Sequence, residues 1–170
     1  MKKIVVFILL SLFSCEKPIS KNNHIEKNDL ESDNLDLGTL VKWDTLFLSA
    51  RFDECGEWGG HKELIEIFRK DKKVYLNYKR NNIDCNKVDE IYGVKLSLIK
   101  EIEVSNQHQK SINDYMFQLL QNKINEGPQD HSGNEFEILK GDSTFLIKVY
   151  DNNPKNVITY NNLLKKLSLK

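Results

Sequence analysis

The segment ELIEIFRKDKKVYLNYKR, from Glu63 to Arg80, decides the fold class of this chain. Its two halves are rich in β-branched, aromatic and other apolar residues, and Asp71-Lys72 separates them. The second half alternates apolar with polar side chains, which is the pattern of a half-buried strand. Two such runs across a two-residue connection are typical of a β-hairpin, so the segment predicts a pair of antiparallel strands.

A second hairpin is predicted towards the C-terminus. Four large apolar residues flank Gly141-Asp142, two on each arm: Phe136, Ile138, Phe145 and Ile147. We expect Lys140 to pair with Ser143, which would place Ile138 opposite Phe145. In that register all four apolar side chains lie on one face of the sheet.

Two further strands are predicted between the N-terminal region and the helices. Residues 41–52 alternate around Val41, Trp43 and Phe47 and predict a strand that precedes the first hairpin. Residues 88–104 fit either a strand or a helix by their apolar spacing, and we favour a strand near 94–103.

Two helices complete the predicted fold. Residues 107–125 carry apolar side chains at helical spacing: Ile112, Tyr115, Met116, Leu119, Leu120 and Ile124. Either Ser111 with Asp114 caps this helix, or Ser105 starts it earlier, and Gly127-Pro128 ends it. A short C-terminal helix is predicted from Val157 to Leu167. Together the elements predict an α+β domain: an antiparallel sheet of two hairpins plus an N-terminal strand, with two helices on one face.

Length and charge limit the classes of function. The 170 residues fit one folded domain, and 25 Lys and Arg balance 25 Asp and Glu. If residues 1–14 are removed, Lys2 and Lys3 leave with them, so 23 basic residues face 25 acidic ones and the formal charge becomes −2. Nucleic-acid binding depends on clustered Lys and Arg, so we expect no nucleic-acid partner.

The first fifteen residues carry the most specific signal in the chain. Lys2-Lys3 is followed by an apolar run from Ile4 to Phe13, and the quartet Leu12-Phe13-Ser14-Cys15 closes it. This stretch resembles a bacterial lipoprotein signal; Phe13 is bulkier than the family's usual residue. The resemblance implies that Cys15 receives a diacylglycerol, that cleavage follows Ser14, and that Cys15 is then N-acylated, as in many Gram-negative bacteria; two acyl chains already give stable anchoring. The run is shorter than the roughly 20 apolar residues that span a bilayer.

The residues after Cys15 refine the expected location. Lipoproteins of this kind that stay at the inner membrane commonly carry Asp directly after the modified Cys, whereas this chain has Glu16 and Lys17. The resemblance therefore implies an outer-membrane anchor, facing either the periplasm or the exterior. We expect a signal peptide at 1–14, a lipidated Cys and flexible polar tether at 15–38, and a globular domain at 39–170.

Cys55 and Cys85 are the two remaining cysteines, and the envelope is oxidising. If Lys70 pairs with Lys73 in the first hairpin, both cysteines lie near its open base, within bridging range. We therefore predict a Cys55–Cys85 disulfide. The alternative is a zinc site formed by Cys55, His61 and Cys85 with Asp53, Glu54 or Glu57, although the close ligand pairs typical of zinc sites are absent from the sequence.

The loop around Trp58 holds the densest group of unusual residues. Glu57, Trp58 and His61 lie among three glycines and form a possible recognition surface, or the loop is a tight connection whose Trp packs on the sheet. We identify no catalytic motif, metal site or cofactor. The sequence therefore predicts a lipid-anchored envelope protein with a non-enzymatic binding or accessory domain for a protein or envelope polymer. The alternative is a small hydrolase that uses His61 with Glu57 or Glu63.

Overall fold

The computed structural model describes residues 36–56, 59–86, 95–126, 133–151 and 154–170. These residues form one six-stranded sheet with helices. The elements, in chain order, are α1 (Leu37–Leu40), β1 (Leu46–Arg51), β2 (Lys62–Lys70), β3 (Lys73–Arg80), β4 (Ser97–Glu103), α3 (Asn106–Ile124), β5 (Asn134–Lys140), β6 (Leu146–Asp151) and α4 (Pro154–Lys166). The expected signal peptide, Cys15 and almost all of the expected tether lie outside the described residues.

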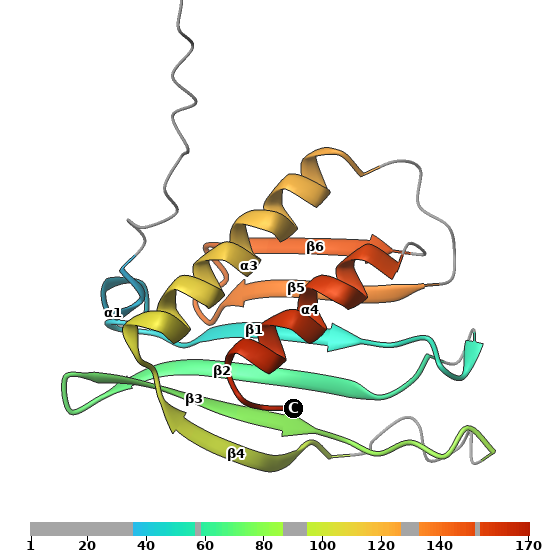
Figure 1. Cartoon of the computed structure of the whole chain (residues 1–170), viewed down its shortest axis with the longest axis horizontal. Coiled ribbons are helices and arrows are strands. Elements are labelled where there is room, and N and C mark those ends of the chain that lie inside the picture. The colour runs from blue at the N-terminus through green and yellow to red at the C-terminus, as the bar shows by residue number, and fades with distance from the viewer. Residues whose placement is uncertain (1–35, 57–58, 87–94, 127–132, 152–153) are drawn as a thin grey trace, which may run out of the picture. The chain divides into compact units, whose positions relative to one another are not determined.

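The sheet is antiparallel throughout, and its strand order is β4-β3-β2-β1-β5-β6. β1 lies at the centre, between the β2–β3 hairpin and the β5–β6 hairpin. Helices α3 and α4 lie on the same face of the sheet (Figure 1). The predicted α+β class is confirmed, including the two hairpins, the N-terminal strand and the two helices on one face.

The first hairpin has the predicted register. Lys70 pairs with Lys73, and Glu63 pairs with Arg80 at the open end. Asp71 and Lys72 both adopt positive φ, at 50° and 68°. Two positive φ values are the requirement of a type I′ turn, whose twist matches that of the flanking strands. The register predicted from the two-residue connection is therefore correct.

The predicted register of the second hairpin was wrong by two residues. Ile138 pairs with Ile147 and not with Phe145. The loop is wider than predicted because Lys140 N donates to Phe145 O, and the Asp142 carboxylate accepts from Thr144 N at 3.0 Å. A shift of two residues keeps the same side chains on each face, and Ile147 is buried as predicted. Phe145 lies just before β6 begins and is 38% exposed.

The first strand is shorter than the predicted 41–52. A single helical turn, α1, precedes it, and Leu37 and Val41 are both buried in the core. The folded part therefore includes the last residues of the expected tether. Trp43 does not alternate into the sheet but lies in the loop between α1 and β1, where it is 88% exposed.

Residues 97–103 form β4, which confirms the strand favoured for this segment; residues 88–94 of the ambiguous stretch lie outside the described residues. The helix α3 begins after Ser105, whose side chain accepts from His108 N at 3.2 Å, so the earlier of the two predicted starts is correct. Ser111 is inside the helix and donates to Gln107 O. Leu120 and Ile124 were predicted to face the core but are 39% and 74% exposed.

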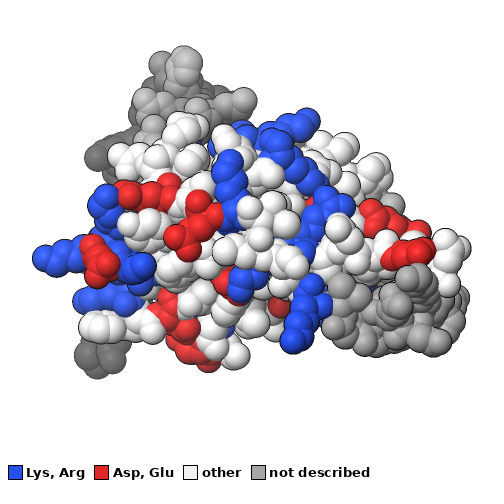
Figure 2. Space-filling view, turned by 90° about the horizontal axis from the view of Figure 1, so that it is seen from below, with Lys and Arg blue, Asp and Glu red and all other residues white. Residues whose placement is uncertain are grey.

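The core lies between the sheet and the two long helices. Inward residues of the strands pack against the buried residues of α3 and α4. Tyr160 of α4 is fully buried, with its ring 5.9 Å from the rings of both Tyr115 and Phe136. Aromatic rings at this spacing contribute beyond their buried area. On the face drawn in Figure 2, Lys and Arg are interspersed with Asp and Glu and form no extended patch of one sign.

Candidate functional site

The most unusual group of polar residues lies at one end of the sheet, where β1 ends and β2 begins. The loop from Phe52 to His61 folds back on β1, and Phe52 N donates to His61 O at 3.0 Å, which continues the ladder by one pair. Gly60 permits this close approach, because a Cβ there would lie 2.4 Å from Phe52 O. Gly59 adopts a φ of +82°, which favours glycine.

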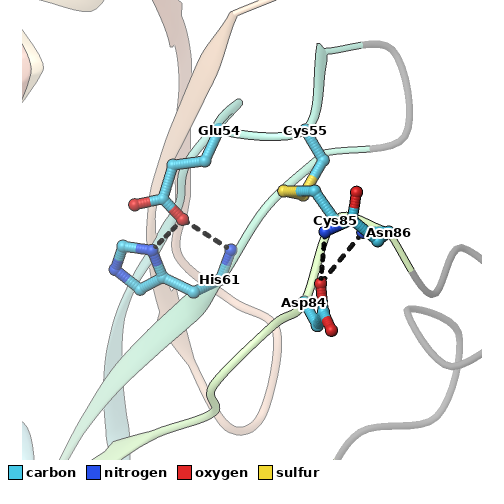
Figure 3. The surroundings of a disulfide bond; sticks show 6 residues. All are labelled: Glu54, Cys55, His61, Asp84, Cys85 and Asn86. Atoms are coloured by element: carbon cyan, nitrogen blue, oxygen red, sulfur yellow. Dashed lines mark hydrogen bonds and ion pairs between the residues drawn. A yellow bond between two sulfur atoms is a disulfide. The ribbon is translucent and has the colours of Figure 1, made fainter.

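This loop places His61 between two carboxylates. His61 Nδ1 lies 2.5 Å from Glu54 Oε2, and His61 Nε2 lies 3.1 Å from Glu63 Oε1. The backbone N–H of His61 also points to Glu54 Oε2, at 3.4 Å (Figure 3). His61 is only 6% exposed, and its imidazole stacks on the ring of Phe52, with centroids 4.3 Å apart. The contacts on both ring nitrogens fix the orientation of the imidazole.

Glu63 is the fully buried centre of the group. Besides His61, its Oε1 contacts Lys170 Nζ at 3.2 Å and Arg80 at 3.7 Å. Burial alone would raise the pKa of Glu63, but the hydrogen bond from His61 and the charge of Lys170 outweigh it and lower that pKa. The carboxylate is therefore ionised, with cations contributed by the loop, by β3 and by the last residue of the chain.

The same contacts decide the charge of His61. Burial would lower the pKa of His61, but the hydrogen bonds to Glu63 and Glu54 raise it. Two ionised carboxylates on the two ring nitrogens require both nitrogens to donate, which only the protonated imidazolium does. Burial raises the pKa of the nearby Tyr78 and Tyr160 hydroxyls, and the negative charge of Glu63 adds to the effect.

We call His61, Glu54, Glu63, Arg80 and Lys170 the histidine cluster. It combines three cations with two anions, and it joins the β1–β2 loop, β2, β3 and the C-terminal end of the chain. A general base needs a nitrogen that faces its substrate, and here both nitrogens face carboxylates of the protein itself, the buried Glu63 and the half-exposed Glu54. The geometry is that of a structural ion-pair network that stabilises one end of the sheet.

A disulfide lies beside the histidine cluster. Cys55 and Cys85 are bonded, with their Cα atoms 5.3 Å apart, which confirms the predicted bridge. The bond connects the β1–β2 loop, directly after Glu54, to the segment that follows β3 (Figure 3). The zinc alternative is wrong as stated, because both cysteine sulfurs are used in the bond. Within the described residues, no group of three or more His, Cys, Asp or Glu side chains is arranged to hold a metal ion.

The structure brings together part of the predicted site. Glu63, proposed as a partner of His61, is in contact with it, whereas Glu57 and Trp58 lie outside the described residues. Glu54 was considered only as a carboxylate of the zinc alternative, and sequence reasoning missed Arg80 and Lys170. The predicted hairpin register already placed Arg80 opposite Glu63, so the sequence could have indicated this ion pair. No pattern in the sequence indicates that Lys170 lies near Glu63.

Searches of protein-family models, of curated proteins and of solved structures each return no match to this chain. In the part of the chain that the structure describes, no helix has the length and apolar character needed to cross a bilayer.

Proposed function

We propose that this chain is a lipoprotein of the cell envelope, attached to the outer membrane through Cys15, with an α+β domain that binds a protein or envelope polymer without enzymatic activity. The observation that carries the proposal is the sequence Leu12-Phe13-Ser14-Cys15 at the end of the apolar run. The two acyl chains of a diacylglycerol on Cys15 would anchor the protein stably, because a single acyl chain binds membranes only reversibly.

The disulfide supports an envelope location. Bonded cysteine pairs persist in oxidising compartments and are rare where thiols are kept reduced. Closing a loop of about 31 residues also constrains the unfolded chain, by roughly 3–4 kcal/mol in the chain-entropy model. A small domain gains a large share of its net stability from such a bond.

A non-enzymatic role is favoured over the hydrolase alternative by the state of His61. His61 is 6% exposed, and its imidazole is bonded through both nitrogens, so it lacks the free nitrogen that a general base needs. This difference is measurable by modification with diethyl pyrocarbonate, followed by peptide mass analysis. We expect His61 to react only after unfolding in urea. Rapid modification of His61 in the native protein would favour the hydrolase.

The anchor is tested in cells that produce the full chain. With labelled palmitate in the medium, the chain should become labelled and should sediment with outer membranes. The matched control is Cys15→Ser, which should abolish both the label and the sedimentation while leaving the Cys55–Cys85 bond intact. An unlabelled wild-type chain, or equal sedimentation of the two proteins, would contradict the proposal.

A further inference from the structure

The end of the sheet opposite the histidine cluster exposes three large apolar side chains. Trp43 is 88% exposed in the loop between α1 and β1, and Phe145 and Leu146 are 38% and 57% exposed where β6 begins. Lys42 Nζ lies 4.9 Å from the centre of the Trp43 ring. We call Trp43, Phe145 and Leu146 the tryptophan surface. Removing the exposed Trp43 ring from water, by contact with a membrane or a partner, would be favourable because it buries a large apolar surface.

The two loops that carry the tryptophan surface are fixed to each other. The Asp44 carboxylate accepts from Thr45 N at 2.7 Å and from Asp142 N in the β5–β6 turn. Gly141 N donates to Thr45 O at 2.8 Å, and a Cβ on Gly141 would collide with Asp44. Trp43 therefore extends from a braced loop, held beside the turn that carries Phe145.

The chain enters the fold at the same end. Asp36 is the first described residue and caps α1, which lies with the β2–β3 and β5–β6 turns at one end of the sheet (Figure 1). Residues 16–35 separate Asp36 from Cys15. A path of that length spans at most about 75 Å, so a lipid at Cys15 would keep the point where the chain enters the fold within that distance of the bilayer. Tethering raises the local concentration of a surface to roughly the millimolar range, which is enough to populate weak contacts.

Charge at this end is nearly balanced. Lys73 is paired with Glu103, and Lys140 is paired with Asp142. The remaining charges at this end are Lys42, Arg69, Lys70 and Lys72 against Asp36, Asp44 and Asp71, so basic side chains are in excess by only one and a strong preference for anionic lipid is not expected. Trp instead belongs to the residues that concentrate at the level of the lipid headgroups, where the apolar part of the ring and its N–H are both satisfied.

We infer that the tryptophan surface binds the lipid headgroup region of the membrane and that the Trp43 side chain inserts among the headgroups. This inference rests on the proposed anchor at Cys15 and adds an orientation to it. The sheet end with α1 faces the membrane, and the histidine cluster and disulfide face away from it.

The test uses two single-tryptophan forms of the full chain, isolated from membranes and reconstituted in vesicles of phosphatidylethanolamine and phosphatidylglycerol. Trp58→Phe leaves Trp43 as the fluorophore. The control combines Trp43→Phe and Trp58→Phe with Ile124→Trp, which places an indole at another exposed apolar position, at the far end of α3. A 19-residue helix is about 27 Å long, so the control reports from well away from the tryptophan surface. The vesicles contain phosphatidylcholine with a nitroxide near the headgroup, and mass analysis reads the lipid on Cys15.

We expect the nitroxide to quench Trp43 severalfold more than the tryptophan at position 124, with little change on adding salt. Equal quenching of the two reporters, or none, in a lipidated preparation would overturn the orientation and leave the anchor standing. A Trp43 spectrum that shifts with protein concentration but not with lipid would assign the surface to a second copy of the chain and also overturn it. Absence of lipid on Cys15 would contradict the anchor itself, and the orientation would fall with it.

Discussion

Removing the Cys55–Cys85 bond should cost stability without changing the fold. The two cysteines are 30 positions apart, and the bond closes a loop of about 31 residues. The chain-entropy model gives roughly 3–4 kcal/mol for a loop of this length. The β2–β3 ladder within that loop has its own hydrogen bonds and buried side chains, so the native hairpin should persist in Cys55→Ala/Cys85→Ala.

The expected loss can be converted into a melting temperature. For a folded part of this size, 1 kcal/mol shifts the midpoint by roughly 3–5 °C, so the loss of 3–4 kcal/mol should lower the melting temperature of the double variant by about 9–20 °C. Urea unfolding followed by circular dichroism gives the free energy directly. Cys15→Ala is the matched control, because it removes a cysteine outside the bond and should leave the midpoint unchanged. A loss below about 1 kcal/mol would refute the assignment of a stabilising role to the bond.

The bond should also be coupled to the histidine cluster, because Glu54 directly precedes Cys55. Glu54→Gln removes one carboxylate from His61, and about 1 kcal/mol is expected, since half of the Glu54 side chain is exposed. Without the disulfide the loop is less constrained, so the same substitution should cost less. Equal costs in the two backgrounds would show that the bond does not position Glu54.

Three further results are expected. Stability should be highest between about pH 4.5 and 6.5, the ordinary pKa values of Glu and His. Protonated His61 stabilises the fold fully below pH 6.5, and this contribution is lost as the pH rises through the raised pKa of His61. Glu54 and Glu63 stabilise the fold above pH 4.5, and their contribution is lost as the pH falls through their lowered pKa values. Urea unfolding across pH measures this, and His61→Gln should flatten the profile at neutral and higher pH; an unchanged profile would contradict it. Gly60→Ala should destabilise by about 1–3 kcal/mol, because the added Cβ meets the backbone of Phe52 and Glu54 just after β1, and a neutral effect would show that the loop lies elsewhere. Ile147→Ala should cost about 2–5 kcal/mol and Phe145→Ala much less, as measured by thermal unfolding; the reverse order would restore the register predicted from sequence.

The comparison of the two hairpins shows what the sequence could predict. Asp71-Lys72 connects its strands by local geometry alone, so the register followed from spacing. Gly141-Asp142 resembles a similar connection, but Gly141 is needed for close approach to Asp44, a residue nearly a hundred positions away. A contact of this kind leaves no local pattern, and the register prediction failed for that reason.

The histidine cluster shows the same division between local and distant information. Glu63 shares the buried face of β2 with Ile65 and Ile67, where its carboxylate requires a cation, but Leu64 and Phe68 put apolar residues on the other face too, so the sequence alone does not show which face is buried. Arg80 follows from the hairpin register. Lys170 reaches Glu63 only because α4 folds over the sheet, and no spacing in the sequence predicts that contact.

The attachment of the chain is tested most directly by the mass of its N-terminal peptide, isolated from the outer-membrane fraction. We predict a peptide that begins at Cys15 and carries a thioether-linked diacylglycerol and an amide-linked acyl group. A peptide that retains residues 1–14, or that begins at Cys15 with a free thiol and a free amine, would contradict it.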